Sequence, residues 1–366
     1  GGVLFAAFTG KAALVMTRKG TPAQTIHSLI YRHSEASPEE IARVSEELAV
    51  LERDLPRMGV AERGFAEAQI AQLKLRLDHI HEPQFVLNPQ SDLRDADLLV
   101  LDEVSMVGTD MAQDLLAFGK PILVLGDPGQ LPPVKSTGFF TEAAADVMLT
   151  EVHRQAADSP ILRLATMARQ GEPIPFGAFD DQVWKMSRQE VGPAQMLQGE
   201  QVICGTHATR RRLNNAMKGA AGFDADYPAG AGEKIICLRN RHDLGLINGM
   251  FLTLTDVRAH LHNDRAFHAS VQTDDGACVS GAQEFWRGEF DDHVRFDPDR
   301  HRREWMACRG LIQSSWGYAI TCHKAQGSQW QNIVVFDDGF GRTTEDRNRW
   351  LYTAITRAER GLLILS

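Results

Sequence analysis

Six short apolar runs constrain the fold of this chain more than any other feature of its sequence. They are "VLFAAF" (3–8), "LLVL" (98–101), "PILVLG" (121–126), "QVICGT" (201–206), "NIVVF" (332–336) and "LLIL" (362–365). Runs of this kind, without polar alternation, are typical of parallel strands that are buried on both faces. The runs fall into two groups separated by polar, helix-compatible sequence. They therefore predict two α/β domains that bind ligands at the carboxyl ends of their strands.

A different pattern lies between the first two runs. The stretch "SPEE" predicts a helix start, with Ser37 as N-cap, Pro38 at the first helical position and Glu40 completing a capping box. Two series with spacings of three and four residues follow, on either side of "PRMG": Ile41, Val44, Leu48, Leu51 and Leu55, then Ala66, Ile70, Leu73, Leu77 and Ile80. They predict an antiparallel helical hairpin over 37–82. Its apolar stripe is either the seam between the two helices or a surface that binds a protein partner.

From about 232 to 315 the pattern changes again. An Asn248-Gly249 turn is followed by the alternating segments "MFLTLTDV" and "FHASVQT". This combination predicts small antiparallel β structure, inserted into the second α/β domain.

Composition narrows the classes of function. A length of 366 residues with 43% apolar residues suits two or three globular domains, and a net charge of −9 disfavours nucleic-acid binding through bulk positive potential. Two basic stretches, 207–218 and 299–305, are either solvated faces or a local nucleic-acid site. The sequence has no apolar run that could span a membrane, so we expect a cytoplasmic protein with no membrane partner. Its five cysteines include no C-x-x-C pair, which argues against cysteine-bound zinc and a disulfide framework.

Carboxylates follow two of the apolar runs. Asp102 and Glu103 come directly after "LLVL", and "PILVLG" leads into Asp127 and Gln130. An isolated Asp-Glu pair is more often a solvated turn. Two neighbouring strand ends of this kind instead suit a Mg²⁺ ligand, a carboxylate that polarises water and an amide that senses a γ-phosphate.

The stretch "AAFTGKAAL" (6–14) contains a Gly10-Lys11 pair behind a strand. A phosphate loop needs G-x-x-x-x-G-K-[ST], but Phe5 stands at its first position and Ala12 at its last. No other segment fits better, so the sequence predicts that this stretch is not a phosphate loop.

Seven segments, in order, are similar to the successive motifs of superfamily 1B DNA helicases of the RecD/Dda type: "AAFTGKAA", "TIHSLIY", "LVLDEVSM", "LGDPGQLPPV", "LTEVHRQ", "GYAITCHKAQGSQW" and "WLYTAITRA". The resemblance implies two RecA-like domains of the P-loop NTPase type, over 1–157 and 158–366. The helical hairpin would be inserted in the first, and a small SH3-like β module in the second. ATP would bind in the cleft, with single-stranded DNA moved 5′ to 3′ across both domains.

The resemblance also implies roles for residues at matching positions. Asp102 would bind Mg²⁺, Glu103 would activate water and Gln130 would couple the γ-phosphate to DNA. Arg154 and Arg357 would contact that phosphate, and Gly327 and Ser328 would join the nucleotide and DNA sites. DNA contacts would come from Phe8, Thr9, Lys11, Thr25, His27, Pro132, Pro133, Thr321, His323 and Lys324.

Two departures from the family pattern shape these expectations. The phosphate loop should precede "AAFTGKAA", so we expect the sequence to lack the Walker A segment and to be inactive alone, either as a fragment or as a homologue that has lost ATP binding. A helical hairpin also stands where the family has a small β element that splits duplexes. The expected partners are single-stranded DNA and duplex junctions. The alternatives are a non-hydrolysing single-strand-binding or scaffold protein and a helicase subunit of a helicase–nuclease complex.

Overall fold

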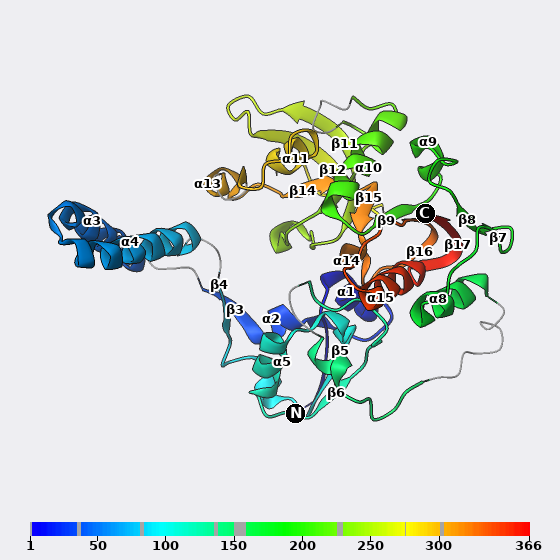
Figure 1. The fold of residues 1–366 in the computed structure, drawn as a ribbon, viewed down its shortest axis with the longest axis horizontal. Coiled ribbons are helices and arrows are strands. Elements are labelled where there is room, and N and C mark those ends of the chain that lie inside the picture. The colour runs from blue at the N-terminus through cyan, green and yellow to red at the C-terminus, as the bar shows by residue number, and fades with distance from the viewer. Residues whose placement is uncertain are drawn as a thin grey trace.

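The structure, a computed structural model, describes residues 2–34, 38–80, 84–134, 138–149, 159–224, 230–274, 276–300 and 304–366. In these ranges the chain forms a four-stranded, a five-stranded and a six-stranded sheet and one two-stranded ribbon (Figure 1). No helix within them is both long and apolar enough to cross a membrane.

The N-terminal sheet is parallel, in the order β2-β1-β5-β6. Its strands are β1 (Val3–Ala7), β2 (Gln24–Thr25), β5 (Leu98–Asp102) and β6 (Ile122–Val124). Its helices are α1 (Gly10–Arg18), α2 (Ile26–Ile30), α5 (Thr109–Leu116) and α6 (Phe139–Glu142). The parallel strands predicted at 3–8, 98–101 and 121–126 are confirmed. We call this part of the chain the N-terminal unit.

The C-terminal sheet has the order β15-β9-β16-β17-β8-β7, parallel except for the edge strand β7. Its strands are β7 (Gly177–Ala178), β8 (Val183–Met186), β9 (Gln201–Cys204), β15 (Ala319–Thr321), β16 (Trp330–Phe336) and β17 (Ala358–Leu365). Its helices are α8 (Pro160–Gln170), α9 (Pro193–Met196), α10 (His207–Ala220), α14 (Cys322–Ala325) and α15 (Thr344–Ile355). The strands predicted at 201–206, 332–336 and 362–365 are confirmed. This is the C-terminal unit.

An antiparallel sheet interrupts the C-terminal unit between α10 and β15, with the order β13-β12-β11-β10-β14. Its strands are β10 (Lys234–Cys237), β11 (Phe251–Ala259), β12 (Ala266–Thr273), β13 (Gln283–Trp286) and β14 (Ser314–Trp316). The antiparallel β structure predicted within 232–315 is confirmed. Gly249 precedes β11 with φ 92°, a left-handed conformation that suits glycine in the predicted turn.

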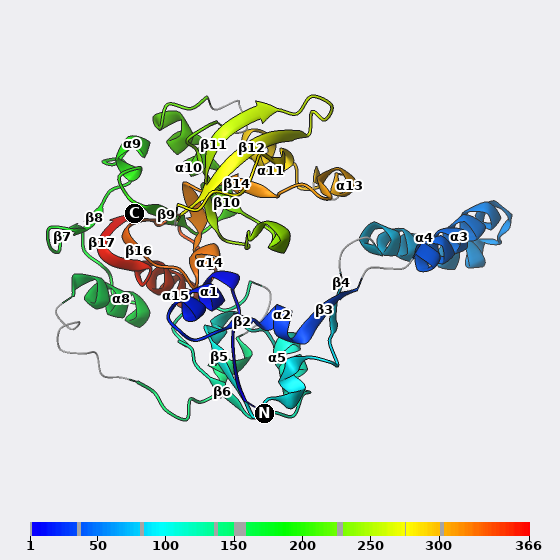
Figure 2. The same ribbon diagram turned by 180° about the vertical axis from the view of Figure 1, so that it is seen from behind.

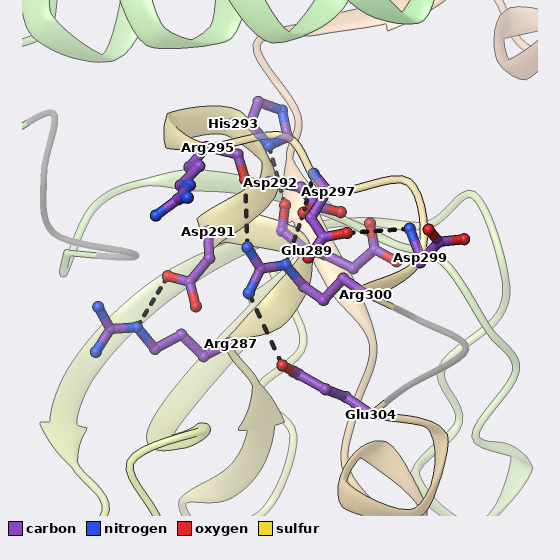
Figure 3. Close-up of polar contacts among 10 residues, drawn as sticks. All are labelled: Arg287, Glu289, Asp291, Asp292, His293, Arg295, Asp297, Asp299, Arg300 and Glu304. Carbon is purple, nitrogen blue, oxygen red and sulfur yellow. Dashed lines mark hydrogen bonds and ion pairs between the residues drawn. The ribbon is translucent and has the colours of Figure 1, made fainter.

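The connection between β13 and β14 contains α11 (Gly288–Val294) and α13 (Trp305–Cys308) and is rich in charge (Figure 3). Arg300 Nε lies 2.7 Å from Asp292 Oδ1, and Arg287 Nε lies 3.0 Å from Asp291 Oδ1. In the basic stretch 299–305, Arg300 is therefore neutralised by a neighbouring carboxylate.

The predicted hairpin segment contains α3 (Pro38–Asp54), the 3-10 turn η1 (Leu55–Arg57) and α4 (Val60–Ile80). The ribbon of β3 (Tyr31–Ser34) and β4 (Gln84–Leu87) joins these helices to the N-terminal unit. In both views they stand away from the rest of the molecule (Figures 1 and 2). We call α3, η1 and α4 the arm. The proposed N-cap Ser37 lies outside the described residues.

The apolar stripe of the arm forms the seam between its two helices. Val44 and Leu73 are buried there, with Ile41, Leu48, Leu51 and Leu77 packed around them. Lys74 Nζ lies 2.6 Å from Glu52 Oε1 across the seam. Of the two alternatives for the stripe, the seam is the one that the structure supports.

A fully buried ion pair ties α10 to the antiparallel sheet. Lys218 Nζ lies 3.2 Å from Glu233 Oε1, and their side chains are 1% and 0% exposed. The ammonium also lies 4.2 Å from the ring centroid of Trp316. Removing one partner from such a pair leaves the other charge buried and uncompensated, which costs more than the pair itself contributes.

We predict that Lys218→Ala lowers the free energy of unfolding by about 3–5 kcal/mol, because Glu233 is left as a lone buried charge. Arg258→Ala, which breaks the exposed Arg258–Asp256 pair, is the matched control and should cost about 1 kcal/mol or less. Urea denaturation followed by tryptophan fluorescence measures both. Equal, small losses for the two variants would show that the buried pair does not stabilise this unit.

Candidate nucleotide and DNA site

Two acidic residues end β5 in a strained turn. Glu103 has φ 55° and ψ 45°, and it is the one non-glycine residue in the described ranges with positive φ. Its amide donates to Asp102 Oδ1 at 2.9 Å. A left-handed conformation at a residue with a side chain costs about 1–3 kcal/mol and is concentrated at functional sites. The turn therefore holds the two carboxyl groups in a fixed relation at the strand's carboxyl end.

The environment of Glu103 favours its neutral form. Burial raises the pKa of the Glu103 carboxyl above its ordinary value, the positive charge of Arg357 opposes this, and the charges of Asp102 and Asp127 add to the increase. A carboxyl group tuned in this way can take a proton from water more readily than an ordinary glutamate. Arg357, whose charge opposes the increase, belongs to the C-terminal unit.

The loop after β6 lies between the two units. Asp127 Oδ1 accepts a hydrogen bond from Gly129 N at 2.8 Å, and its Oδ2 accepts one from the Tyr352 hydroxyl at 2.6 Å. Leu131 N donates to Thr353 Oγ1 at 2.9 Å. Tyr352 and Thr353 belong to α15, so this helix fixes the loop from the opposite unit.

Gln326 completes the contacts on this loop. Its side chain is buried, and Nε2 donates to Leu131 O at 2.9 Å and to Ser105 Oγ at 3.4 Å. The neighbouring Gln130 Oε1 is buried without a hydrogen-bond partner among the described residues. An orphaned buried amide oxygen is a polar group for which a ligand could supply the partner.

Arg357 is buried at the end of α15, where protein oxygens surround its guanidinium. Nε donates to Thr353 O at 3.1 Å, Nη1 to Ser328 O at 3.3 Å and Nη2 to Thr356 Oγ1 at 3.1 Å. The fork is thus oriented by its own unit. Arg154 lies outside the described residues.

Gly327 and Ser328 connect this region to the start of α1. Gly327 has φ 72°, and a Cβ atom placed on it would lie 2.8 Å from Thr9 Oγ1. Ser328 O accepts from Arg357 on the other side. The glycine is required both for its backbone conformation and for this close approach. Thr9 itself caps α1 by accepting from Ala12 N at 3.2 Å.

Lys11 points into the contact between the units. Its Nζ lies 5.0 Å from the ring centroid of Trp330 and 5.3 Å from that of Phe251. Burial lowers the pKa of the Lys11 ammonium, which the charge of Asp274 partly opposes. Both rings can stabilise this cation across the boundary between the units. No local sequence pattern predicts Phe251 or Trp330 as the partners of Lys11.

The other predicted DNA residues of the C-terminal unit gather around α14. His323 makes a hydrogen bond with the backbone of Pro132, and burial lowers the pKa of its imidazole. Lys324 Nζ contacts Asn248 Oδ1, and Thr321 is buried at the start of α14. The partly buried Pro133 follows Pro132 in the loop.

Two predicted DNA residues of the N-terminal unit, Phe8 and His27, belong to an aromatic cluster at the base of the arm. The His27 ring centroid lies 5.7 Å from those of Phe8 and Tyr31 and 5.5 Å from that of Phe85. Phe85 is 52% exposed. Thr25 caps α2 by accepting from Ser28 N at 3.0 Å. We call Phe8, His27, Tyr31 and Phe85 the aromatic cluster.

Sequence reasoning assigned no role to Tyr31, Phe85 or Gln326. Tyr31 and Gln326 stand inside segments that carry the family resemblance, so their positions in these motifs could have indicated a functional role. Phe85 is in β4, and nothing in its local sequence distinguishes it.

The basic stretch 207–218 forms most of α10, and several of its cations have partners within the protein. The Arg211 guanidinium lies 3.8 Å from the Phe296 ring centroid and that of Arg212 lies 5.5 Å from the Phe336 centroid. Lys218 belongs to the buried ion pair. In this conformation, the charged groups of these three residues therefore already have partners within the protein, which leaves them less available to bind DNA phosphates.

Comparison with known proteins agrees with this geometry. A family model described as an AAA domain matches residues 1–184, half of the 366-residue chain, and one described as a UvrD-like helicase C-terminal domain matches 317–365. The ATP-dependent RecD2 DNA helicase of Deinococcus radiodurans is 27% identical over 289 residues, or 72% of this chain. The chain spans 35% of that relative's length.

The fold is also similar to that of a solved structure. The crystal structure of Pif1 helicase from Candida albicans aligns with a TM-score of 0.51 at 17% identity, covering 100% of this chain and 84% of that one. Together, these matches show that the chain belongs to the AAA-domain family and is similar to helicases of the RecD type.

Proposed function

We propose that this chain is the motor part of an ATP-dependent DNA helicase that moves 5′ to 3′ along single-stranded DNA. One observation carries the proposal. Glu103 stands in a strained turn of the N-terminal unit, under the charge of Arg357 from the C-terminal unit, and Arg357 is joined through Ser328 and Gly327 to Thr9. Such a chain of contacts suits a protein that couples nucleotide chemistry to movement on DNA.

The residues around β5 fit the roles that this function needs. Asp102 would hold Mg²⁺, which supplies charge neutralisation on phosphate oxygens when bound. Glu103 would take a proton from the attacking water, and Gln130 would couple the γ-phosphate to DNA. Arg357 and Arg154 would stabilise charge on the γ-phosphate. The buried, unpartnered Gln130 Oε1 supports a ligand at this point.

The domain assignments belong to the same proposal. The two parallel sheets would be RecA-like domains over 1–157 and 158–366, and the antiparallel sheet inserted at about 232–315 would be an SH3-like module. Gly327 and Ser328 would relay nucleotide state to DNA. Single-stranded DNA would lie along the aromatic cluster, Thr9, Thr25 and the residues around α14, and it would be bound through stacking and backbone contacts without base preference.

The first prediction concerns Glu103→Gln in a protein that carries a phosphate loop ahead of β1. ATP binding should persist while hydrolysis falls by orders of magnitude, because the amide cannot accept the proton. In the unsubstituted protein, hydrolysis should decline on acidification at a higher pH than an ordinary glutamate would cause, since burial raises the pKa of Glu103. Steady-state ATPase assays across pH measure both effects. Glu142→Gln, at an exposed carboxylate of α6, is the control, and equal rates in the two variants would remove Glu103 from catalysis.

The second prediction concerns the aromatic cluster. Phe8→Ala should weaken binding to single-stranded DNA by about 1–3 kcal/mol, or roughly 5- to 150-fold in Kd, because one stacking surface is lost. Added salt should weaken binding further. Fluorescence anisotropy on labelled oligonucleotides measures this, with Phe176→Ala, at an exposed phenylalanine before β7, as the control. An unchanged Kd for Phe8→Ala would place the DNA elsewhere.

The third prediction concerns the arm, which we propose guides the duplex or binds a protein partner. Its seam is filled by its own side chains, so a partner would have to use its outer surface, where Phe65 is 70% exposed. Replacing 38–80 with a short Gly-Ser linker should preserve DNA-stimulated ATPase and reduce unwinding of forked DNA or capture of a partner. If unwinding and complex formation both persist at full level, the arm has neither role.

A further inference from the structure

Three side chains of types that bind metal ions lie together on the outer face of the antiparallel sheet. His260 directly follows β11, His268 is in β12 and Glu284 is in β13. His268 and Glu284 are paired across adjacent strands. One ligand atom from each of the three side chains lies within 4.8 Å of the others.

We propose that His260, His268 and Glu284 bind a divalent transition-metal ion of the Zn²⁺ class. Two imidazoles and one carboxylate are a ligand set that such ions prefer, whereas Mg²⁺ and Ca²⁺ select oxygen ligands. The absence of a C-x-x-C pair argues only against cysteine-bound zinc and does not concern these residues. A fourth coordination position would be open to water.

One of the three separations already has the value that a metal requires, and the other two are within 4.8 Å. Two ligands at ~2.0–2.1 Å from a tetrahedral zinc ion lie about 3.3–3.4 Å from one another. His260 Nε2 and Glu284 Oε1 are already 3.3 Å apart. The side chain of His260 is 18% exposed and that of Glu284 is 51% exposed, so an ion can reach them from solvent.

The backbone that carries these ligands is held firmly from the opposite face. Phe267 and Phe285, each adjacent in sequence to a ligand, are buried and stacked with ring centroids 5.3 Å apart. Because successive residues of a strand face opposite sides, this core fixes the strand positions from which His268 and Glu284 project. Arg258, on the outer face beside them, is paired with Asp256 at 2.9 Å.

Binding requires two local adjustments. The two imidazole rings are stacked at 4.7 Å with an interplanar angle of 12°, so one ring must turn before both nitrogen lone pairs can point at one ion. His260 Nδ1 accepts from His262 N at 3.2 Å, which leaves the ring proton on Nε2, facing Glu284. The ion takes the place of that proton, which moves to Nδ1, and the hydrogen bond from His262 N is given up. Both changes are confined to side chains and the hairpin turn.

The test uses the full chain in a Cys278→Ser background, because Cys278 is the exposed cysteine and could bind metal independently. After treatment with chelator, Zn²⁺ is titrated by calorimetry and Co²⁺ by visible absorption. We expect one equivalent to bind, with a Zn²⁺-dependent rise in Tm because the ion binds the folded sheet. His260→Ala, His268→Ala and Glu284→Gln should each weaken affinity at least tenfold and abolish the rise in Tm.

His242→Ala, at an exposed histidine of the same unit, is the matched control and should bind as the parent does. Glu284→Gln preserves the shape of the side chain, so it tests the site even if a histidine variant unfolds, which circular dichroism would reveal. The proposal is overturned if the parent binds no stoichiometric Zn²⁺, or if Glu284→Gln and the folded histidine variants bind it with unchanged affinity.

Discussion

The packing of the two units depends on how the loop after β6 is held between them. Leu131 is buried, and its backbone amide and carbonyl are both hydrogen-bonded by the C-terminal unit. Thr353 accepts from the amide, and Gln326 donates to the carbonyl. Tyr352 binds Asp127 in the same loop. Because unpaired buried polar groups are costly, these bonds define one relative position of the units.

Other features of the site follow from this position. Arg357 is held by oxygens of its own unit and still acts on Glu103 in the other, and the next segment brings Gly327 against Thr9. A change in the distance between the units would therefore alter both the position of Arg357 relative to Glu103 and the contact of Gly327 with Thr9. The Lys11 contacts with Phe251 and Trp330 add a desolvated cation to the same boundary. We infer that the boundary couples the proposed nucleotide and DNA sites.

The sequence predicted the strands of both parallel sheets because uninterrupted apolar runs are a strong local signal, and it predicted Asp102 and Glu103 at a strand end for the same reason. The seam of the arm followed from helical periodicity. The residues that contact one another across the boundary between the units could not be predicted from local patterns. Gln326 bonds to Leu131 across 195 positions, and Lys11 meets Phe251 only in the folded chain, so neither contact leaves a periodic pattern. The His260, His268 and Glu284 group likewise depends on the register of three strands.

The central claim, that the Leu131 loop couples the two units, is tested most directly with Gln326→Leu, which removes the donor and keeps the bulk. Hydrogen exchange measured by mass spectrometry should show faster exchange of amides in 126–131. In a protein that carries a phosphate loop, DNA should no longer stimulate hydrolysis, although basal hydrolysis and single-strand affinity persist. Gln331→Leu, at an exposed glutamine nearby, should change neither property. Unchanged exchange together with full DNA stimulation in Gln326→Leu would contradict the account.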